Sequence, residues 1–238
     1  MGLAYKFDWS VLWREPYGEW MLQGIWLTLQ LGFLALIIAF FLGIFVGTMR
    51  AAPWKLLRLV STIYVEIFRN VPFLVQLFFW FYAVPMIFGK TLQFKINAIS
   101  GLNYYAAVVG LGLYTASRVA EHVRAGFASI GQGQYQAALS TGMSQWQMYW
   151  HIMIPHALRL ILPPLTTEFL TIFKNSSVAM TIGVAETTFM SYKIDSDTFH
   201  GLEATTGAMF VYLVLGMAVV KTMSYIETRF RIHGLVGR

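Results

Sequence analysis

Ionisable and amide side chains inside long apolar stretches are the groups in this chain that could do chemistry. A charge surrounded by apolar residues in a membrane is costly, and by default it marks a site that pairs with it or attracts a charged solute. These residues suggest a polar path through an apolar chain, not a catalytic centre. The candidates for this path are Glu66, Arg69, Asn70, Glu168, Lys174, Asn175 and Ser176.

Each group also has a structural interpretation, in which long side chains pair near the end of a helix and extend toward water. Glu66 and Arg69 are three residues apart and share a helical face. Arg118, Glu121 and Arg124 repeat that spacing, with His122 beside them, and we favour a structural role for this second set. Lys174 with its polar neighbours is the strongest candidate for the path, because a cation there would attract an anionic solute.

The motifs of common catalytic centres are missing from the sequence. It contains no complete phosphate-binding loop, HExxH or GxSxG. It also has no cysteine, which excludes disulfides and Cys-ligated metals. We therefore expect no enzyme activity, no metal site and no bound cofactor in this chain.

The composition indicates what must hold these polar groups. Of the 238 residues, 57% are apolar and only 12% are charged, and several windows are long enough to cross a bilayer. We expect an all-α, polytopic membrane protein with about five transmembrane helices, organised as one domain over residues 1–238. The five apolar regions are Trp20–Met49, Ile63–Phe88, Tyr104–Ala128, Ala157–Thr188 and Thr206–Tyr225.

Local features refine this arrangement. Pro163 and Pro164 remove backbone donors, which predicts a broken helix in the fourth region. Gly43 and Gly47 form a small-xxx-small motif that permits close helix approach, within the chain or at a dimer seam. The distribution of Lys and Arg at the ends of the apolar regions places the C-terminus in the cytoplasm and the N-terminus on the periplasmic side.

The segment at about residues 129–156, called the polar loop here, is almost uncharged and joins the third and fourth regions. Its sequence predicts two short helices. Gly142 is expected to cap the first in a left-handed conformation, and Ser144 with Gln147 fits a capping box that begins the second. Pro155 is expected to end the second helix. The second helix would carry an apolar face formed by Trp146, Tyr149, Trp150 and Met153.

Such a face could lie on lipid headgroups or dock into a groove on another protein. The polar side of the helix lacks the Lys and Arg residues that anionic lipid would attract, since the basic side chains between Arg124 and Arg159 are His151 and His156 alone. This favours a protein groove. With the third and fourth regions connected on the cytoplasmic side, the groove would belong to a cytoplasmic protein.

The loop resembles the cytoplasmic "EAA" loop of bacterial ABC importer permeases. The matching positions are Ala137, Ala138, Gly142 and Pro155, whereas the first motif position, usually glutamate, is Gln136 here. The segments at 64–79, 116–134 and 162–183 also resemble the polar amino-acid uptake group of these permeases. Within that group, "FRN" at 68–70 and "KNSSVA" at 174–179 look most like glutamate/aspartate permeases.

This resemblance implies the permease subunit of an ATP-driven importer for polar amino acids in the bacterial inner membrane. The implied partners are a second permease subunit, two ATP-binding subunits that bind ATP and Mg, and a periplasmic substrate-binding protein, with no nucleic acid. The heterodimer of permeases is favoured over a homodimer. The implied ATPase-coupling residues are Gln136, Ala137, Ala138, Gly142, Trp146, Tyr149, Trp150 and Pro155.

Two other functions are compatible with an apolar chain of this kind. An ion-coupled secondary carrier would show internal repeats with broken helices in matching halves, and five regions with one break do not fit that pattern. A membrane scaffold that does not transport would use the polar loop only to recruit a soluble partner.

Overall fold

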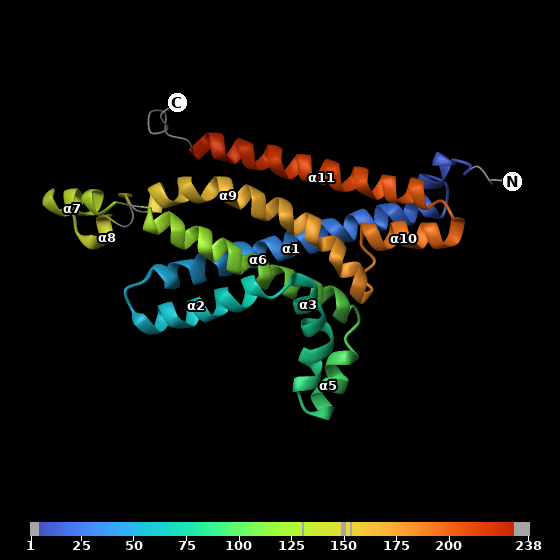
Figure 1. Ribbon diagram of the computed structural model, residues 1–238, viewed down its shortest axis with the longest axis horizontal. Helices are drawn as coiled ribbons and strands as arrows, with labels where there is room; N and C mark the ends of the chain where they lie inside the picture. Colours follow the sequence, from blue (N-terminus) through green and yellow to red (C-terminus); the bar gives the residue numbers. More distant parts are fainter. Residues whose placement is uncertain (1–4, 130, 149–150, 153, 231–238) are drawn as a thin grey trace. The chain divides into compact units, whose positions relative to one another are not determined.

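The computed structural model describes residues 5–129, 131–148, 151–152 and 154–230. Within these ranges the chain forms helices joined by turns and bends, with no strand, as the sequence predicts (Figure 1). The residues group into two compact units, which are described separately. Four helices contribute residues to both units, namely α1 (Tyr17–Ala51), α6 (Leu102–Ala128), α9 (Ile154–Asn175) and α11 (Gly201–Phe230).

Unit 1 comprises Met1–Ala35, Phe73–Leu111 and Thr171–Met217. Val11, Met21, Ile194 and Ala204 form a buried apolar cluster in it. Besides its parts of the four long helices, it contains the 3-10 turn η1 (Trp9–Leu12), α3 (Phe73–Phe78), the π-helical turn η2 (Phe79–Ala83), α4 (Val84–Ile87), α5 (Lys90–Asn97), the 3-10 helix η4 (Ser176–Ile182) and α10 (Thr187–Thr198).

Two fully buried carboxylates in unit 1 bind backbone N–H groups. Glu186 lies at the N-terminus of α10 and accepts hydrogen bonds from the N–H groups of Thr188 at 3.0 Å and Phe189 at 2.9 Å. Glu203 accepts a hydrogen bond from the N–H of Asp8 at 2.7 Å. Burial of a carboxylate is tolerated where donors satisfy it. The Glu186 bonds cap α10, and the Glu203 bond joins the N-terminal segment to α11.

Unit 2 comprises Leu36–Pro72, Gly112–Leu170 and Ala218–Arg238. Val46, Val65 and Ala120 form its buried cluster, with one residue each from α1, α2 and α6. Besides its parts of the long helices, it contains α2 (Lys55–Asn70), α7 (Gln132–Ser140) and α8 (Gln145–Met148).

The small-xxx-small motif lies at a contact between α1 and α6 in unit 2. A Cβ atom on Gly43 would lie 2.5 Å from Cγ1 of Val119. One on Gly47 would lie 2.5 Å from Cβ of Val123 and 2.6 Å from the carbonyl oxygen of Ala120. Both distances are shorter than atomic contact permits, so the two helices approach each other closely within this chain because both positions are glycine.

The apolar regions do not all form single straight helices. The second region is interrupted because α2 ends at Asn70, Val71 is extended (φ −89°, ψ 131°) and α3 begins at Phe73. The conformation of Val71 follows from Pro72, which disfavours a helical residue before it. The third region is preceded by the short α5, and the two helices are bent by 98°.

Among the described residues, two helices could cross a membrane by length and composition, Tyr17–Ala51 and Gly201–Arg229. The number rises to four if each of two interrupted pairs is one span, Lys55–Asn70 with Phe73–Ile87 and Lys90–Asn97 with Leu102–Ala128. The fourth expected region, Ala157–Thr188, corresponds mainly to α9, which carries Arg159, Glu168 and Lys174.

The expected break at the double proline is wrong. Helix α9 continues through Pro163 and Pro164, and ends only at Asn175, where the 3-10 helix η4 begins. The φ angle of proline is compatible with a helix. Its destabilising effect, the lost hydrogen bond and the clash with a carbonyl, is confined to the preceding turn. Ala157, Ile161, Leu165 and other apolar residues of α9 are buried, and their packing holds the helix on both sides of the prolines.

Alanine substitutions at Gly47 and at Gly133 should have opposite effects on stability. Gly47→Ala inserts a methyl group against Val123 and the Ala120 carbonyl, and should lower the free energy of unfolding by about 1–3 kcal/mol. Gly133→Ala is the matched control, because Gly133 also lies in a helix but its Cβ would meet nothing within 4 Å. Alanine there should stabilise α7 by about 0.5–1 kcal/mol. Thermal unfolding of the purified variants in detergent measures both, and an unchanged Tm for Gly47→Ala would contradict the close contact.

Candidate functional site

The polar loop is built from two short helices whose ends are closed by local hydrogen bonds. Gly142 follows α7 with a positive φ of 78°, the left-handed conformation predicted for a helix cap. The N–H of Thr141 donates to the carbonyl of Ala137 at 3.2 Å, and the N–H of Met143 donates to that of Ala138 at 3.3 Å. These bonds satisfy carbonyls that the end of a helix leaves free, as in a Schellman motif.

The capping box at the start of α8 is also present. The backbone N–H of Ser144 donates to Oε1 of Gln147 at 2.9 Å, and the N–H of Gln147 donates to the Ser144 hydroxyl at 3.2 Å. Two backbone donors at the helix start are therefore satisfied by each other's side chains, as the sequence predicts.

The two helices of the polar loop pack together while most of their described polar surface stays exposed. Ala138 and Met148 are 4% and 1% exposed, and α7 contacts α8. Gln136, Ala137 and Gly142 are exposed. Within unit 2, α7 and α8 lie beyond the ends of α6 and α9 (Figure 1). The buried pair holds the helices together, and the exposed residues are available to another molecule.

The predicted aromatic face falls on residues about which the structure says little. Trp146 belongs to α8, but the placement of its side chain is not described. Tyr149, Trp150 and Met153 lie outside the described residues. The face therefore remains a prediction from the spacing of these residues.

The expected role of Pro155 in ending a helix is wrong. Helix α9 begins at Ile154, so Pro155 lies in its first turn. The N–H groups of a first helical turn have no acceptor within the helix, so a proline there loses no hydrogen bond. Pro155 therefore starts the next helix instead of stopping the previous one.

Glu168 is the centre of an ion-pair cluster in unit 2. It is 3% exposed. Its carboxylate lies 2.6 Å from Nε of Arg118 and 3.0 Å from Nε2 of His122. Residues 118 and 122 are one turn apart on α6, so both reach the same side chain of α9. The buried carboxylate is compensated by a guanidinium, which favours the structural role for Arg118.

A second cluster in unit 2 surrounds Glu121. Nη2 of Arg124 lies 2.5 Å from its Oε1, the predicted pairing of residues three apart, and Arg50 of α1 also binds its carboxylate. Nη2 of Arg50 lies 3.5 Å from Oε1 of Glu66, and Oε2 of Glu66 accepts a hydrogen bond from the Asn70 amide at 3.0 Å. Arg50 is thus a member that the search for charges within apolar stretches missed.

The remaining path candidates lie where α9 gives way to η4 in unit 1. Lys174 is exposed, and Asn175, the last residue of α9, is partly exposed. Ser176 is buried, and its hydroxyl donates to the carbonyl of Phe173 at 2.7 Å. Of these three, Lys174 is the side chain placed to meet an anion. Arg69 of unit 2 is likewise exposed.

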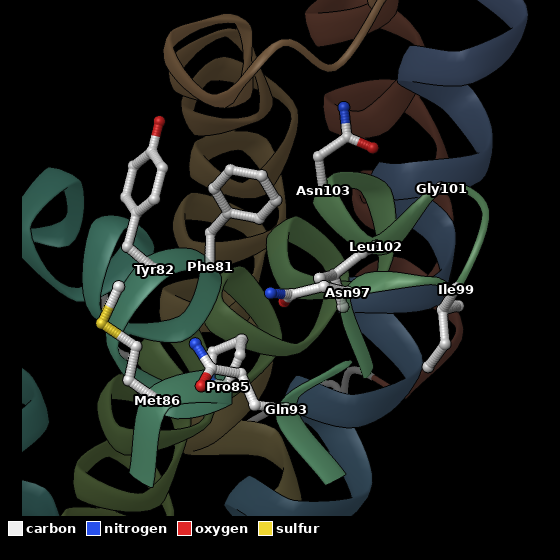
Figure 2. A pocket seen from close by; sticks show the side chains of 10 residues that line it. All are labelled: Phe81, Tyr82, Pro85, Met86, Gln93, Asn97, Ile99, Gly101, Leu102 and Asn103. Carbon is white, nitrogen blue, oxygen red and sulfur yellow. The ribbon is translucent and has the colours of Figure 1, made fainter. Parts of the chain in front are cut away.

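Unit 1 also contains a cavity of about 410 Å³ that the sequence did not indicate. Figure 2 shows aromatic side chains of η2 and amides of α5 and α6 around it, and no lining residue carries a charge. It could accept a neutral polar group but has no cation for a carboxylate. Its lining residues are Phe81, Tyr82, Pro85, Met86, Gln93, Asn97, Ile99, Gly101, Leu102 and Asn103.

Replacement of the buried carboxylate should destabilise the chain. Glu168→Gln removes the charge opposite Arg118 and should lower the free energy of unfolding by about 2 kcal/mol, less than for a fully buried pair because the Arg118 side chain is 38% exposed. Glu19→Gln, at an exposed position, should change stability by less than about 0.5 kcal/mol. Urea unfolding in detergent micelles compares the two. Equal stabilities would show that the pair contributes nothing measurable.

Comparison with known proteins places these features in a family. Residues 39–232 match the family model "Binding-protein-dependent transport system inner membrane component". The chain is 33% identical over 244 residues to the glutamate/aspartate import permease protein GltJ of Escherichia coli (strain K12), covering 99% of both. It is 32% identical over 208 residues to the probable glutamine ABC transporter permease protein GlnM of Bacillus subtilis (strain 168), covering 87% of this chain and 92% of that one.

A solved structure shares the fold over nearly the whole chain. The crystal structure of an amino acid ABC transporter with histidines matches with a TM-score of 0.81 and 31% identity, covering 94% of this chain and 100% of that one. The family model alone covers most of the sequence, including the polar loop and the ion-pair clusters of unit 2. The resemblance of the chain to this family of permeases is thereby confirmed, and the chain belongs to the inner membrane components of binding-protein-dependent transport systems.

Proposed function

We propose that this chain is a transmembrane permease subunit of an ATP-driven importer for polar amino acids, with glutamate and aspartate as substrates. The assignment to amino acids is supported by two relatives named as glutamate/aspartate and glutamine permeases and by the similar amino acid ABC transporter. The choice of acidic amino acids is supported by the higher coverage of the match to GltJ and by the exposed Lys174, whose charge suits an anion.

In this proposal the polar loop couples ATP binding by the ATPase subunits to movement of the membrane helices. The geometry of the loop is the main support for this role. Its two short helices are closed by a left-handed cap and a capping box, while Gln136, Ala137 and Gly142 are exposed. A protruding element that keeps its shape without a large core is suited to fit a groove on a partner. Ala138 acts by holding α7 on α8, and Pro155 by starting α9.

ATP and Mg bind to separate ATPase subunits, two per complex, and this chain supplies no ATPase site of its own. Closure of the ATPase pair on ATP moves the polar loop and shifts the membrane helices between inward-open and outward-open states. ATP can drive this shift only by favouring one of the two states. A second permease subunit completes the path, and a periplasmic binding protein delivers the amino acid.

The proposed setting is the bacterial inner membrane, with the C-terminus and the polar loop in the cytoplasm and the N-terminus on the periplasmic side. This orientation is supported by the excess of Lys and Arg at one set of helix ends. Glu66, Asn70 and Glu168 then contribute to the path by fixing helices through their bonds. Lys174, Asn175 and Ser176 contribute by contacting the solute where α9 ends.

Gly142→Asp should weaken the association with the ATPase. The new side chain adds a charge on the exposed surface at the turn between α7 and α8, so the ATPase subunit should co-purify at least about tenfold less, as expected for an unpaired charge in an interface. Gly131→Asp is the control for the added charge alone, because Gly131 is also an exposed glycine of the polar loop with nothing within 4 Å of its Cβ but lacks the left-handed φ of Gly142. Membrane abundance of both variants is measured by immunoblot. Equal loss of the ATPase from both variants would count against the docking role of Gly142.

Lys174→Gln should reduce uptake of acidic amino acids selectively. In the reconstituted complex, KM for glutamate and aspartate should rise about tenfold or more, the effect of losing a charged hydrogen-bond partner, while glutamine uptake should change little. Lys221→Gln, at an exposed position of α11, is the control for loss of a positive charge. Equal loss for all three amino acids would contradict a substrate contact at Lys174.

A further inference from the structure

A basic cavity of about 430 Å³ lies in unit 2. It is formed where α1 ends, α2 begins and α6 ends. Three arginines from these three helices line it, Arg50, Arg58 and Arg124. Its volume falls within the range of small-ligand sites. The other lining residues are Ala51, Thr62, Phe127 and Ala128.

The charges around the cavity are not balanced by the carboxylates near them. Arg50 and Arg124 both bind Glu121, and Arg50 also pairs with Glu66 at 3.5 Å. In the described part of the chain no ion pair joins Arg58 to a carboxylate, and Arg58 is exposed. Three guanidinium groups therefore face two carboxylates, which leaves an excess of positive charge where an anion could bind.

The helix that carries Arg58 also has an apolar face with no partner within unit 2. Leu56 and Leu59 are 71% and 58% exposed, and Val60 and Ile63 are 52% and 51% exposed. Trp54, which precedes the helix, is 68% exposed, and tryptophan is enriched at the boundary between lipid and water. The same short helix thus offers a cation to the cavity and an apolar surface to hydrocarbon.

We propose that this cavity binds the phosphate group of an anionic phospholipid, with the acyl chains along the exposed apolar face of α2. Guanidinium groups match phosphate oxygens with paired hydrogen bonds. Arg58 supplies the free charge, and the Thr62 hydroxyl lies in the same cavity to donate a further bond. Basic pockets between membrane helices bind such headgroups. The adjoining apolar surface selects a lipid over free phosphate, because only a lipid satisfies both features.

The test uses the full chain purified in detergent and incubated with mixed micelles of phosphatidylglycerol or phosphatidylcholine. These lipids share the phosphate and the acyl chains, but only phosphatidylglycerol carries a net negative charge. Bound lipid per chain is counted by mass spectrometry. The wild-type chain should retain phosphatidylglycerol in preference to phosphatidylcholine, and Arg58→Gln should retain about fivefold less of it, the effect of one basic residue at an anionic surface.

Arg58 is suited to substitution because it is exposed and outside the ion pairs that hold unit 2, so the variant should keep the wild-type Tm without lipid. Lys95→Gln, in α5 of unit 1, is the control for loss of one exposed positive charge and should retain phosphatidylglycerol as the wild type does. Leu59→Gln tests the acyl-chain contact and should also lower retention. Equal retention of both lipids, or wild-type retention by Arg58→Gln, would overturn the proposal.

A final experiment distinguishes the phosphate of a lipid headgroup from free inorganic phosphate. Inorganic phosphate at millimolar concentration should fail to displace bound phosphatidylglycerol, because it gains nothing from the apolar face. Full displacement by phosphate, with Leu59→Gln behaving as the wild type, would overturn the lipid assignment.

Discussion

The close approach of α1 and α6 is the contact on which the arrangement of charges in unit 2 depends. Gly43 and Gly47 leave no room for side chains, so Val119 and Val123 pack directly against the α1 backbone. With the helices held this close, the last turn of α1 brings Arg50 to Glu121. The ion pair and the basic cavity beside it follow from a backbone contact that is set earlier in the helix. Packing between small residues replaces the hydrophobic effect as the force that joins helices in lipid.

The helix caps of the polar loop could be predicted from the sequence, whereas the partners of the charged side chains could not. The left-handed Gly142 and the reciprocal bonds of Ser144 and Gln147 need only the residues within one turn. The pair between Arg50 and Glu121 joins positions 71 residues apart, and Arg118 to Glu168 spans 50. A sequence shows that such charges must find partners in an apolar surrounding, but it does not show which partner each will find.

The prolines show that the rule that proline breaks a helix does not hold at every position. Pro72 interrupts a helix, because Val71 before it is extended. Pro155 lies in a first turn, where its missing N–H costs nothing. Pro163 and Pro164 lie inside a continuous helix whose apolar residues are buried before and after them. The position of each proline within its helix, together with the packing around Pro163 and Pro164, decides whether the helix stops, starts or continues.

The polar loop differs from the rest of the chain in what keeps its shape. The ion-paired helices of unit 2 are held by buried side chains from distant segments, whereas the described part of the loop buries little more than Ala138 and Met148. Its form comes from hydrogen bonds between neighbours in sequence. Such bonds do not depend on how the long helices are placed, so the loop can move with them as one piece. For the proposed function, an element with this local bonding is suited to transmit a displacement, and its exposed side chains would contact the partner that applies the force.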